Sequence, residues 1–502
     1  MRFKIEKKQM INQWGQRVQA MSNLDSRFIL GVMSGTSADA IDLALVECRG
    51  SGYQTTISVQ QTASIPWPAE LRNWFFELAY QSDAPLENIL ELDKAISDFF
   101  AHEITLKVNE WRNNGQSVEW IGFSGQTVFH RGRGGIAKVP QPSPSLNLTK
   151  SVLSLQLGNP ALLARKTKVP VIADFRKDHI ALGFEGAPLS PLAEVLLYSE
   201  NRNRATLNLG GIANITLLPA VNLKNGGESG QVEKQEIGQL TDQLPDQVKE
   251  QLSKENPTPV PVPFSSDAGP ANTVMDQLVR REKPGETYDR DGAYASRGEV
   301  NTKLLEALLK HPFFAMPKPL STGPEEFTLQ WLDSTIQIIQ SEQSRTDRPL
   351  ALEDQLRTLC EVTAISVKNT LMEGLEALWA TSIRQEGYPT FMDPDVTIPV
   401  YASGGGIRNP VLMKTLSDHL ESTPFRLSTS EELGTDSDMK EAILFAVLAN
   451  ERIAGIGWTV NLPQRDHEML SEAPSLASRR NQSDYNVTQK AHFCLGSYYF
   501  PE

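Results

Sequence analysis

A segment rich in glycine and hydroxyl residues, lying between two apolar runs, constrains the fold of this chain most. Residues 31–42 read GVMSGTSADAID, and the flanking residues 28–32 and 41–46 have the length and composition of two β-strands. A tight connection that contains glycine is typical of a β-hairpin. Gly35 would let the backbone turn so that successive N–H groups face one point. The segment therefore predicts a hairpin whose tip can hold an anion.

The side chains at the expected hairpin tip suit a nucleotide phosphate. Ser34, Thr36 and Ser37 supply hydroxyl donors, and Asp39 and Asp42 supply carboxylates suited to a hydrated Mg²⁺. The same residue types are also ordinary turn residues, so a purely structural turn is the alternative interpretation of this segment.

Two further glycine clusters follow a similar plan. The sequence NLGGIANIT at 208–216 is a glycine turn between two expected strands, and SGGGIRNP at 403–410 follows a strand and precedes a helical pattern at 411–420. A glycine loop before a helix allows close backbone approach by a flat ligand such as adenine or ribose. Each cluster alone is more often a structural turn than a site. Three such clusters, each after a strand, favour a protein that grips phosphates from both sides of a cleft.

Composition and charge narrow the class of protein. The chain has 502 residues and a formal net charge of −13, which suggests two or three domains and disfavours nucleic acid and anionic membranes as partners. No stretch approaches the roughly 18 apolar residues of a membrane span. The 3 cysteines are far apart, which argues against a zinc site or a disulfide framework and fits a reducing cytoplasm. Residues 1–27 lack an apolar signal-peptide core, and we expect an N-terminal extension there.

Apolar, β-branched runs alternate with helical patterns along the chain, so the predicted fold class is α/β. The clearest expected strands are residues 120–123, 169–173, 205–209 and 398–402. The clearest expected helices are residues 86–108, 352–379 and 439–453. Residues 221–263 are mostly polar and contain no aromatic residue, and this composition predicts a disordered surface insertion.

Two carboxylates, one at a strand end and one at a helix start, are the candidate catalytic and metal-binding groups. Asp174 ends an expected strand and is followed by Phe175, Arg176 and Lys177. A rigid strand end commonly holds a general base, and adjacent cations hold an anionic substrate; a surface ion pair is the alternative. Glu441 opens an expected helix, where it would either reach a metal or ribose or simply favour the helix N-terminus as an acidic residue.

Several common enzyme signatures are missing from the sequence. There is no P-loop, no GxSxG nucleophile elbow and no HExxH zinc motif. His130 and His179 lack the spacing of metal ligands, so we interpret them as polar residues of a cleft or of the surface.

Many ordered blocks together carry a family resemblance. From about Phe28 to the C-terminus, the chain resembles the anhydro-N-acetylmuramic acid kinases, a family of the actin-like sugar kinase superfamily. The matching blocks are GVMSGTS, GQTVFH, LQLGNPALLA, VIADFRKDHIALGFEGAPL, LNLGGIANIT, DAGPAN, YDRDGAYASRG, STG, SGGGIRNP, KEAILFAVLA and LGSYYFP. The resemblance implies an ATP-dependent kinase that opens the 1,6-anhydro ring of anhydro-N-acetylmuramic acid and phosphorylates O6. The products would be ADP and N-acetylmuramic acid 6-phosphate, formed during cell-wall recycling.

The resemblance also implies an architecture. Two domains would share a ribonuclease H-like core, in a two-domain actin-like sugar kinase fold with an interdomain cleft for ATP and sugar. Domain I would cover 28–175 and domain II 176–460, with the insertion 221–263 inside the second. Residues 461–502 would return to domain I. A homodimer is implied as well.

Site residues carry over from the family as expectations. Asp174 would be the catalytic base that deprotonates the attacking water. The ATP site would comprise Gly35, Thr36, Ser37, Ala38, Asp39, Ala40, Ile41, Asp42, Gly210, Gly211, Gly404, Gly405, Gly406 and Asn409. The sugar would contact Gln126, Thr127, Arg176 and Asn208. Mg²⁺ would be held by Asp39, Asp42 and Glu441, partly through water.

The chain also departs from the family pattern. Ala40 and Ala271 stand where glycine is usual, Ser124 stands where histidine is usual, and Leu320 and Pro324 replace a lysine and an arginine. Ala40 is tolerable only if its φ is negative. The lost cations leave two alternatives open, which are a kinase of another anhydrosugar such as levoglucosan and a non-catalytic homologue that only binds.

Overall fold

The structure of the protein is a computed structural model that describes most of the chain. The described residues are 24–79, 84–132, 152–200, 202–220, 263–323, 326–341, 350–382, 397–433, 438–455, 458–461, 490–493 and 495–501. The expected N-terminal extension before residue 24, the expected insertion before residue 263, most of the C-terminal segment and Pro324 lie outside these residues.

The first sheet is built around the predicted hairpin. Strands β1 (Ser26–Ser34), β2 (Ala40–Arg49) and β3 (Thr56–Pro66) are antiparallel neighbours. Strand β4 (Trp120–Arg131) runs parallel to β1, and β6 (Val171–Ala173) runs parallel to β4. The outer strand β14 (Ser497–Tyr499) pairs antiparallel with β6, and β5 (Leu153–Leu157) pairs with the far part of β4. The resulting order is β3-β2-β1-β4-β6-β14.

The second sheet repeats this topology. Strands β7 (Arg204–Leu209), β8 (Ile212–Leu218) and β9 (Phe264–Pro270) are antiparallel. Strands β10 (Ile398–Ser403) and β11 (Phe425–Thr429) add on in parallel, giving the order β9-β8-β7-β10-β11. Order and direction match the first five positions of the first sheet. This duplication confirms the predicted α/β fold with two ribonuclease H-like units, and only the small pair β12 (Trp458–Asn461) and β13 (Lys490–Phe493) stands apart among the described strands.

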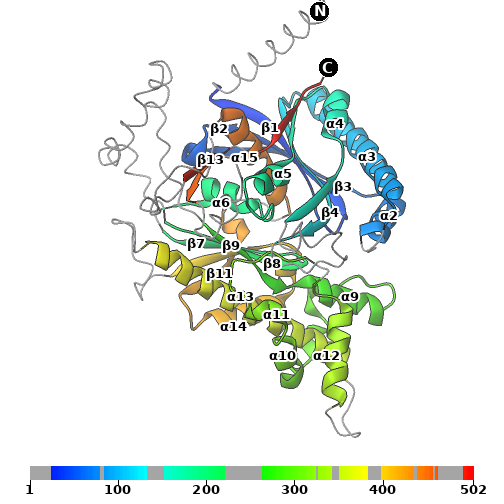
Figure 1. Cartoon of the computed structure of the whole chain (residues 1–502), viewed down its shortest axis with the longest axis vertical. Helices are drawn as coiled ribbons and strands as arrows, with labels where there is room; N and C mark the ends of the chain where they lie inside the picture. The colour runs from blue at the N-terminus through cyan, green and yellow to red at the C-terminus, as the bar shows by residue number, and fades with distance from the viewer. Residues whose placement is uncertain are drawn as a thin grey trace, which may run out of the picture.

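Helices cover both faces of the first sheet, and a second group of helices covers one face of the second sheet (Figure 1). On one face of the first sheet lie α2 (Ala69–Ala79), α3 (Leu86–Asn113) and α4 (Pro160–Thr167), and on the other lie α5 (Phe175–Ala181), α6 (Ser190–Tyr198) and α15 (Lys440–Ala454). The helices packed around the second sheet's core are α9 (Asn272–Glu282), α10 (Thr302–Leu308), α11 (Pro312–Ala315), α12 (Leu329–Ser341), α13 (Leu352–Ser382) and α14 (Pro410–Leu420). No described helix is both long and apolar enough to cross a bilayer.

Helix α15 packs against the first sheet, although it falls in the range 176–460 that we expected in the second domain. Two strand glycines explain this close packing. A Cβ at Gly31 would lie 1.8 Å from the carbonyl oxygen of Ala442, and one at Gly122 would lie 2.4 Å from that of Phe445. Since no side chain fits in those gaps, the helix backbone lies directly on β1 and β4.

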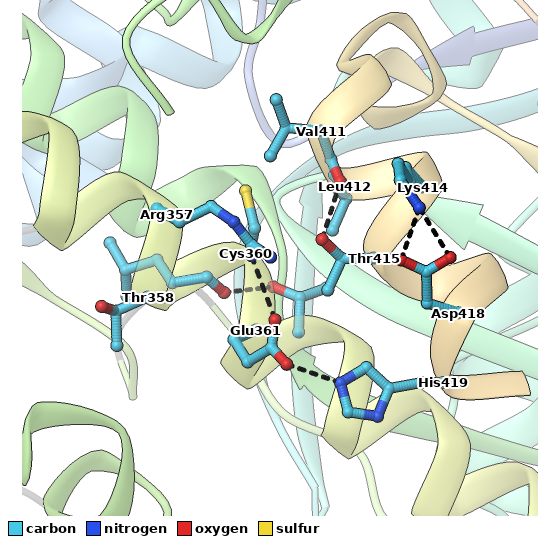
Figure 2. A network of polar contacts seen from close by, with 12 residues as sticks. Arg357, Thr358, Cys360, Glu361, Val411, Leu412, Lys414, Thr415, Asp418 and His419 are labelled. Carbon is cyan, nitrogen blue, oxygen red and sulfur yellow. Dashed lines mark hydrogen bonds and ion pairs between the residues drawn. The ribbon is translucent and has the colours of Figure 1, made fainter. Parts of the chain in front are cut away.

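Helices α13 and α14 are joined by polar as well as apolar contacts (Figure 2). Glu361 on α13 accepts hydrogen bonds from the Arg357 guanidinium at 3.0 Å and from the His419 ring on α14 at 2.7 Å. The start of α14 is fixed by Asn409, whose Oδ1 accepts from the backbone N–H groups of Val411 and Leu412 at 3.0 and 3.2 Å. These contacts hold the loop before α14, which is the triple-glycine loop, against the second core.

Candidate active site

The tip of the β1–β2 hairpin is a tight turn supported from β4. The N–H of Ala38 donates to the carbonyl of Gly35 at 3.0 Å, and Ala38 has a φ of 46°, a left-handed conformation. Gln126 is fully buried, and its Nε2 donates to the same Gly35 carbonyl at 3.0 Å. The Oε1 atom of Gln126 is buried without a hydrogen-bond partner in the described structure. Ala40 is absent from the residues with positive φ, so its extra methyl group is tolerated.

The exposed residues of this tip are polar. Thr36, Ser37 and Asp39 are exposed, whereas the side chains of Ala38 and Ile41 are buried in the core, so those two would meet a ligand only through their backbone. The Asp39 carboxylate forms an ion pair with Arg72 of α2 at 2.6 Å, and Arg72 also donates to the Ser37 carbonyl at 3.2 Å. Arg72, which the sequence analysis did not single out, therefore places a cation beside the tip.

The two other glycine clusters touch each other. Gly404 has a φ of 86°, and a Cβ there would lie 2.5 Å from Oδ1 of Asn208; one at Gly406 would lie 2.7 Å from Cβ of Leu209. The Nδ2 atom of Asn272, on α9, donates to the carbonyls of Leu209 and Gly210 at 3.0 and 2.8 Å. The β7–β8 turn and the triple-glycine loop therefore form one continuous surface in the second domain.

Packing does not explain every glycine in the three clusters. A Cβ at Gly211 would lie 2.4 Å from Oγ1 of Thr273, so that glycine is required by its neighbours. At Gly35, Gly210 and Gly405, by contrast, no atom would lie closer than 3.7 Å to an added Cβ, and none of these three residues has a positive φ. Neither space nor conformation demands glycine there. These three glycines leave open space beside the backbone.

Asp174 lies directly after β6 and is held from two sides. Its backbone is left-handed, with φ of 63°, which is strained for a residue with a Cβ. Lys177 on α5 contacts Oδ1 at 2.6 Å, and the hydroxyl of Tyr499 on β14 donates to Oδ2. The Asp174 side chain is 19% exposed. A strained, partly exposed carboxylate with both oxygens fixed is typical of a functional position.

Arg176 lies at the centre of a charged cluster that draws from both domains. Its guanidinium donates to the Gly186 carbonyl at 3.0 Å. Burial lowers the pKa of Arg176, while the carboxylates of Glu441 and Asp267 act in the opposite direction. Burial, together with the nearby charge of Arg176, lowers the pKa values of His130 and His179 to about 4, so both rings are neutral near pH 7.

Two contacts join the two domains around this cluster. Asn208 on β7 donates to Glu441 on α15 at 3.2 Å, and burial raises the pKa of Glu441. The Oγ of Ser321 lies 3.4 Å from Nε2 of His130 on β4. The pKa of Asp276 on α9 is raised to about 6, mainly by burial and also by repulsion from Asp39 of the hairpin tip, while Arg280 acts in the opposite direction. The hairpin tip therefore faces α9 of the second domain.

The altered STG block is anchored by its backbone. The carbonyl of Leu320 accepts from the N–H of Asp267 at 2.8 Å, and the N–H of Thr322 donates to Oδ2 of Asp267 at 2.7 Å. Leu320 in place of lysine leaves these contacts intact because residues 320 and 322 take part in them only through main-chain atoms.

Comparison with known proteins identifies the family of this chain. The model of the family described as anhydro-N-acetylmuramic acid kinase matches residues 27–230 and 256–465. The chain belongs to this family. A kinase of that name from Pseudoalteromonas translucida is 32% identical over 86% of this chain and 90% of its own length. The kinase of the same name from Caldanaerobacter subterraneus is 31% identical over 88% of this chain and 94% of its own length.

Two of the site residues expected from the anhydro-N-acetylmuramic acid kinase family already make side-chain contacts within the protein. Thr127 accepts from Gln156 on β5 at 3.3 Å, and Asn409 uses its side chain to cap α14, so these two have structural partners. Tyr499 was not predicted as a site residue. The only sequence signal for it was its place in the closing block LGSYYFP.

The carboxylates expected to hold Mg²⁺ do not form a preassembled metal site. Asp39 pairs with Arg72, Asp42 accepts from Ser64 at 2.7 Å, and Glu441 accepts from Asn208. Within the described part of the chain there is no group of three or more His, Cys, Asp or Glu side chains able to hold a metal. Asp42 nevertheless acts on Glu441, since its charge raises the pKa of that carboxyl. This arrangement fits a cation that keeps most of its water and is bound together with phosphates.

Proposed function

We propose that this protein uses ATP to open the 1,6-anhydro ring of anhydro-N-acetylmuramic acid by hydrolysis and to phosphorylate O6. The observation that carries the proposal is the fixed carboxylate of Asp174 in a chain of this kinase family. A water oxygen would bond to the anomeric carbon, and Asp174 would accept its proton. As the bond from that carbon to O6 breaks, O6 would take the γ-phosphoryl group of ATP. The products would be N-acetylmuramic acid 6-phosphate and ADP, formed in cell-wall recycling.

ATP would lie between the hairpin tip and the glycine surface of the second domain. The exposed hydroxyls of Thr36 and Ser37 and the open backbone at Gly35 suit its phosphates. The open backbone at Gly210 and Gly405 suits the adenosine side. Asp39, Asp42 and Glu441 would hold Mg²⁺ partly through water, and the ion would neutralise charge on the phosphates.

The sugar would lie near the junction of the two domains. Gln126 supports this placement, because its buried Oε1 has no partner in the described structure. Asn208 and Arg176 lie in the charged cluster, and Thr127 follows Gln126 on β4. We propose these four residues as sugar contacts.

We also propose that the two domains comprise residues 28–175 and 176–460, except that α15 packs on the first domain. The protein would act as a homodimer in the cytoplasm.

The proposal is tested with purified protein, ATP, Mg²⁺ and either anhydro-N-acetylmuramic acid or levoglucosan, by following ADP release and product phosphorus resonances. We expect turnover of the muramic sugar, and a loss of kcat of about 10²- to 10⁴-fold in Asp174→Asn. The matched control is Asp418→Asn, because Asp418 is also paired with a lysine, Lys414, but lies exposed on α14 away from Asp174. Turnover of levoglucosan alone would identify the other anhydrosugar kinase. Turnover of neither sugar would overturn the kinase proposal.

A further inference from the structure

The C-terminal strand brings a tyrosine to the expected base from the far end of the chain. Strand β14 pairs antiparallel with β6, with Ser497 opposite Ala173 and Tyr499 opposite Val171. Figure 1 shows this strand in red at the C-terminal end, beside the first sheet and α5. Because β6 ends at Ala173, immediately before Asp174, the pairing of β14 with β6 places β14 next to the Asp174 carboxylate.

The position of β14 is well determined by its own contacts. Gly496, with φ of 103°, donates its N–H to Asp178 at 2.8 Å, and a Cβ there would lie 2.6 Å from Ile172. The hydroxyl of Tyr498 donates to the carbonyl of Arg452 on α15 at 2.8 Å. Since side chains alternate along a strand, Tyr498 packs with the α15 face of the sheet and Tyr499 packs with the opposite face. Two neighbouring tyrosines therefore have different environments.

At Asp174 the two carboxylate oxygens have different donors. The Tyr499 hydroxyl donates to Oδ2, and the Lys177 ammonium contacts Oδ1 at 2.6 Å. Each carboxylate oxygen has a second lone pair, so the carboxylate can still accept a proton from water. Lys177 is 57% exposed, whereas Tyr499 is fixed by the strand pairing. The tyrosine is therefore the stronger determinant of the carboxylate's orientation.

The protonation state of the tyrosine is suited to donation. Burial, the hydrogen bond to Asp174 and the charges of Asp174 and Asp178 raise the pKa of Tyr499 to about 12. The phenol consequently keeps its proton across the physiological range. Among the described residues, Lys177 on α5 and Tyr499 on β14 contact this carboxylate, and the charge of Asp178 acts on Tyr499.

We propose that Tyr499 is a positioning residue for Asp174, so that the C-terminal strand forms part of the active site. This inference rests on the proposed function, in which Asp174 accepts a proton from the attacking water. The hydroxyl holds the carboxylate in the orientation that the water requires.

The test compares Tyr499→Phe with the matched control Tyr498→Phe. Both changes remove one hydroxyl from the same strand, but only the first removes a donor to Asp174. We expect kcat of Tyr499→Phe to fall roughly ten- to a hundredfold, the range for a hydrogen bond to a charged group, with KM for ATP unchanged. Tyr498→Phe should keep both kcat and KM for ATP.

The outcomes separate this inference from the proposed function. If the wild type turns over the sugar, Asp174→Asn is inactive, and Tyr499→Phe matches Tyr498→Phe in kcat, then the positioning role is wrong and the kinase stands. If the wild type turns over neither sugar, both proposals fall. Melting temperatures of the two phenylalanine variants check that each is folded.

Discussion

Lys440 and Glu194 form an ion pair with 2.6 Å between Nζ and Oε1, and their side chains are only 6% and 2% exposed. The other carboxylate oxygen of Glu194 accepts from the Thr206 hydroxyl on β7 at 2.9 Å. Burial acts to lower the pKa of Lys440, but the attraction and hydrogen bond of Glu194 together with the charges of Tyr198 and Glu441 outweigh it and leave that pKa raised. Lys440 precedes Glu441 on α15. The pair thus joins the helix that covers the first sheet to the first strand of the second.

Breaking this pair should be costly. We expect Glu194→Gln to lower the free energy of unfolding by about 3 kcal/mol or more, because it leaves the Lys440 charge buried without its counter-charge. Chemical denaturation measures the loss. The control is Asp418→Asn, which breaks the pair of Lys414 with Asp418 on the surface of α14 (Figure 2), where the side chains are 76% and 52% exposed. That change should cost under about 1 kcal/mol. Equal losses in the two variants would contradict the prediction.

The contact of α15 with the first sheet gives a second prediction. Gly122→Ala places a Cβ 2.4 Å from the Phe445 carbonyl oxygen and 3.0 Å from the Ala449 Cβ, so the helix must shift. We expect a loss of about 3 kcal/mol in the free energy of unfolding, at the upper end of the usual range for overpacking. A stability within about 0.5 kcal/mol of wild type would show that the helix adapts easily. The matched comparison is Gly405→Ala, where the nearest atom to an added Cβ is 4.0 Å away.

Local patterns predicted most of the secondary structure. Both hairpins, the strand before the triple-glycine loop and the helix that Glu441 opens are all present. These features depend on neighbouring residues, since alternation and glycine placement act within about ten positions of the chain. The predicted ribonuclease H-like repeat came from the family resemblance, and the strand orders confirm it.

The sequence patterns did not predict which elements far apart in the chain pack together. The helical period of residues 440–454 indicates a helix but does not say which sheet it covers. The contact of Tyr499 with Asp174 spans 325 positions and depends on how β14 pairs. Asparagine suits both a helix cap and a ligand contact, so the sequence could not decide between these roles for Asn409. In the structure its side chain caps α14. Geometry, not residue type, decides between such alternatives.

A third prediction concerns the open glycines. At Gly405 the nearest atom to an added Cβ is 4.0 Å away, and φ is not positive, so Gly405→Ala should fold with wild-type stability. If ATP approaches the backbone there, the new methyl group should raise KM for ATP about tenfold while kcat changes little. Steady-state kinetics and a melting curve together test this. An unchanged KM would remove Gly405 from the nucleotide site.

The fourth prediction concerns acid stability and His179. Its ring stacks on Phe184 with centroids 4.8 Å apart, and its Nδ1 accepts from the N–H of Gly186 at 3.1 Å. Burial and the charge of Arg176 lower its pKa from 6.5 to about 4. Between these two values the unfolded chain binds the proton and the folded chain does not, so stability should fall as the pH falls through this window.

His179→Gln should remove this pH dependence while keeping an oxygen that can accept from Gly186. From pH 6.5 to pH 4 the wild type should lose up to about 3 kcal/mol more than the variant, since each pKa unit corresponds to about 1.4 kcal/mol. The loss is an upper value because the ring is only partly buried. Urea unfolding at several pH values measures both curves, and His130 contributes equally to each. The control is His102→Gln on α3, where the side chain is 69% exposed. Parallel curves for His179→Gln and the wild type would show that the ring titrates alike in the folded and unfolded states.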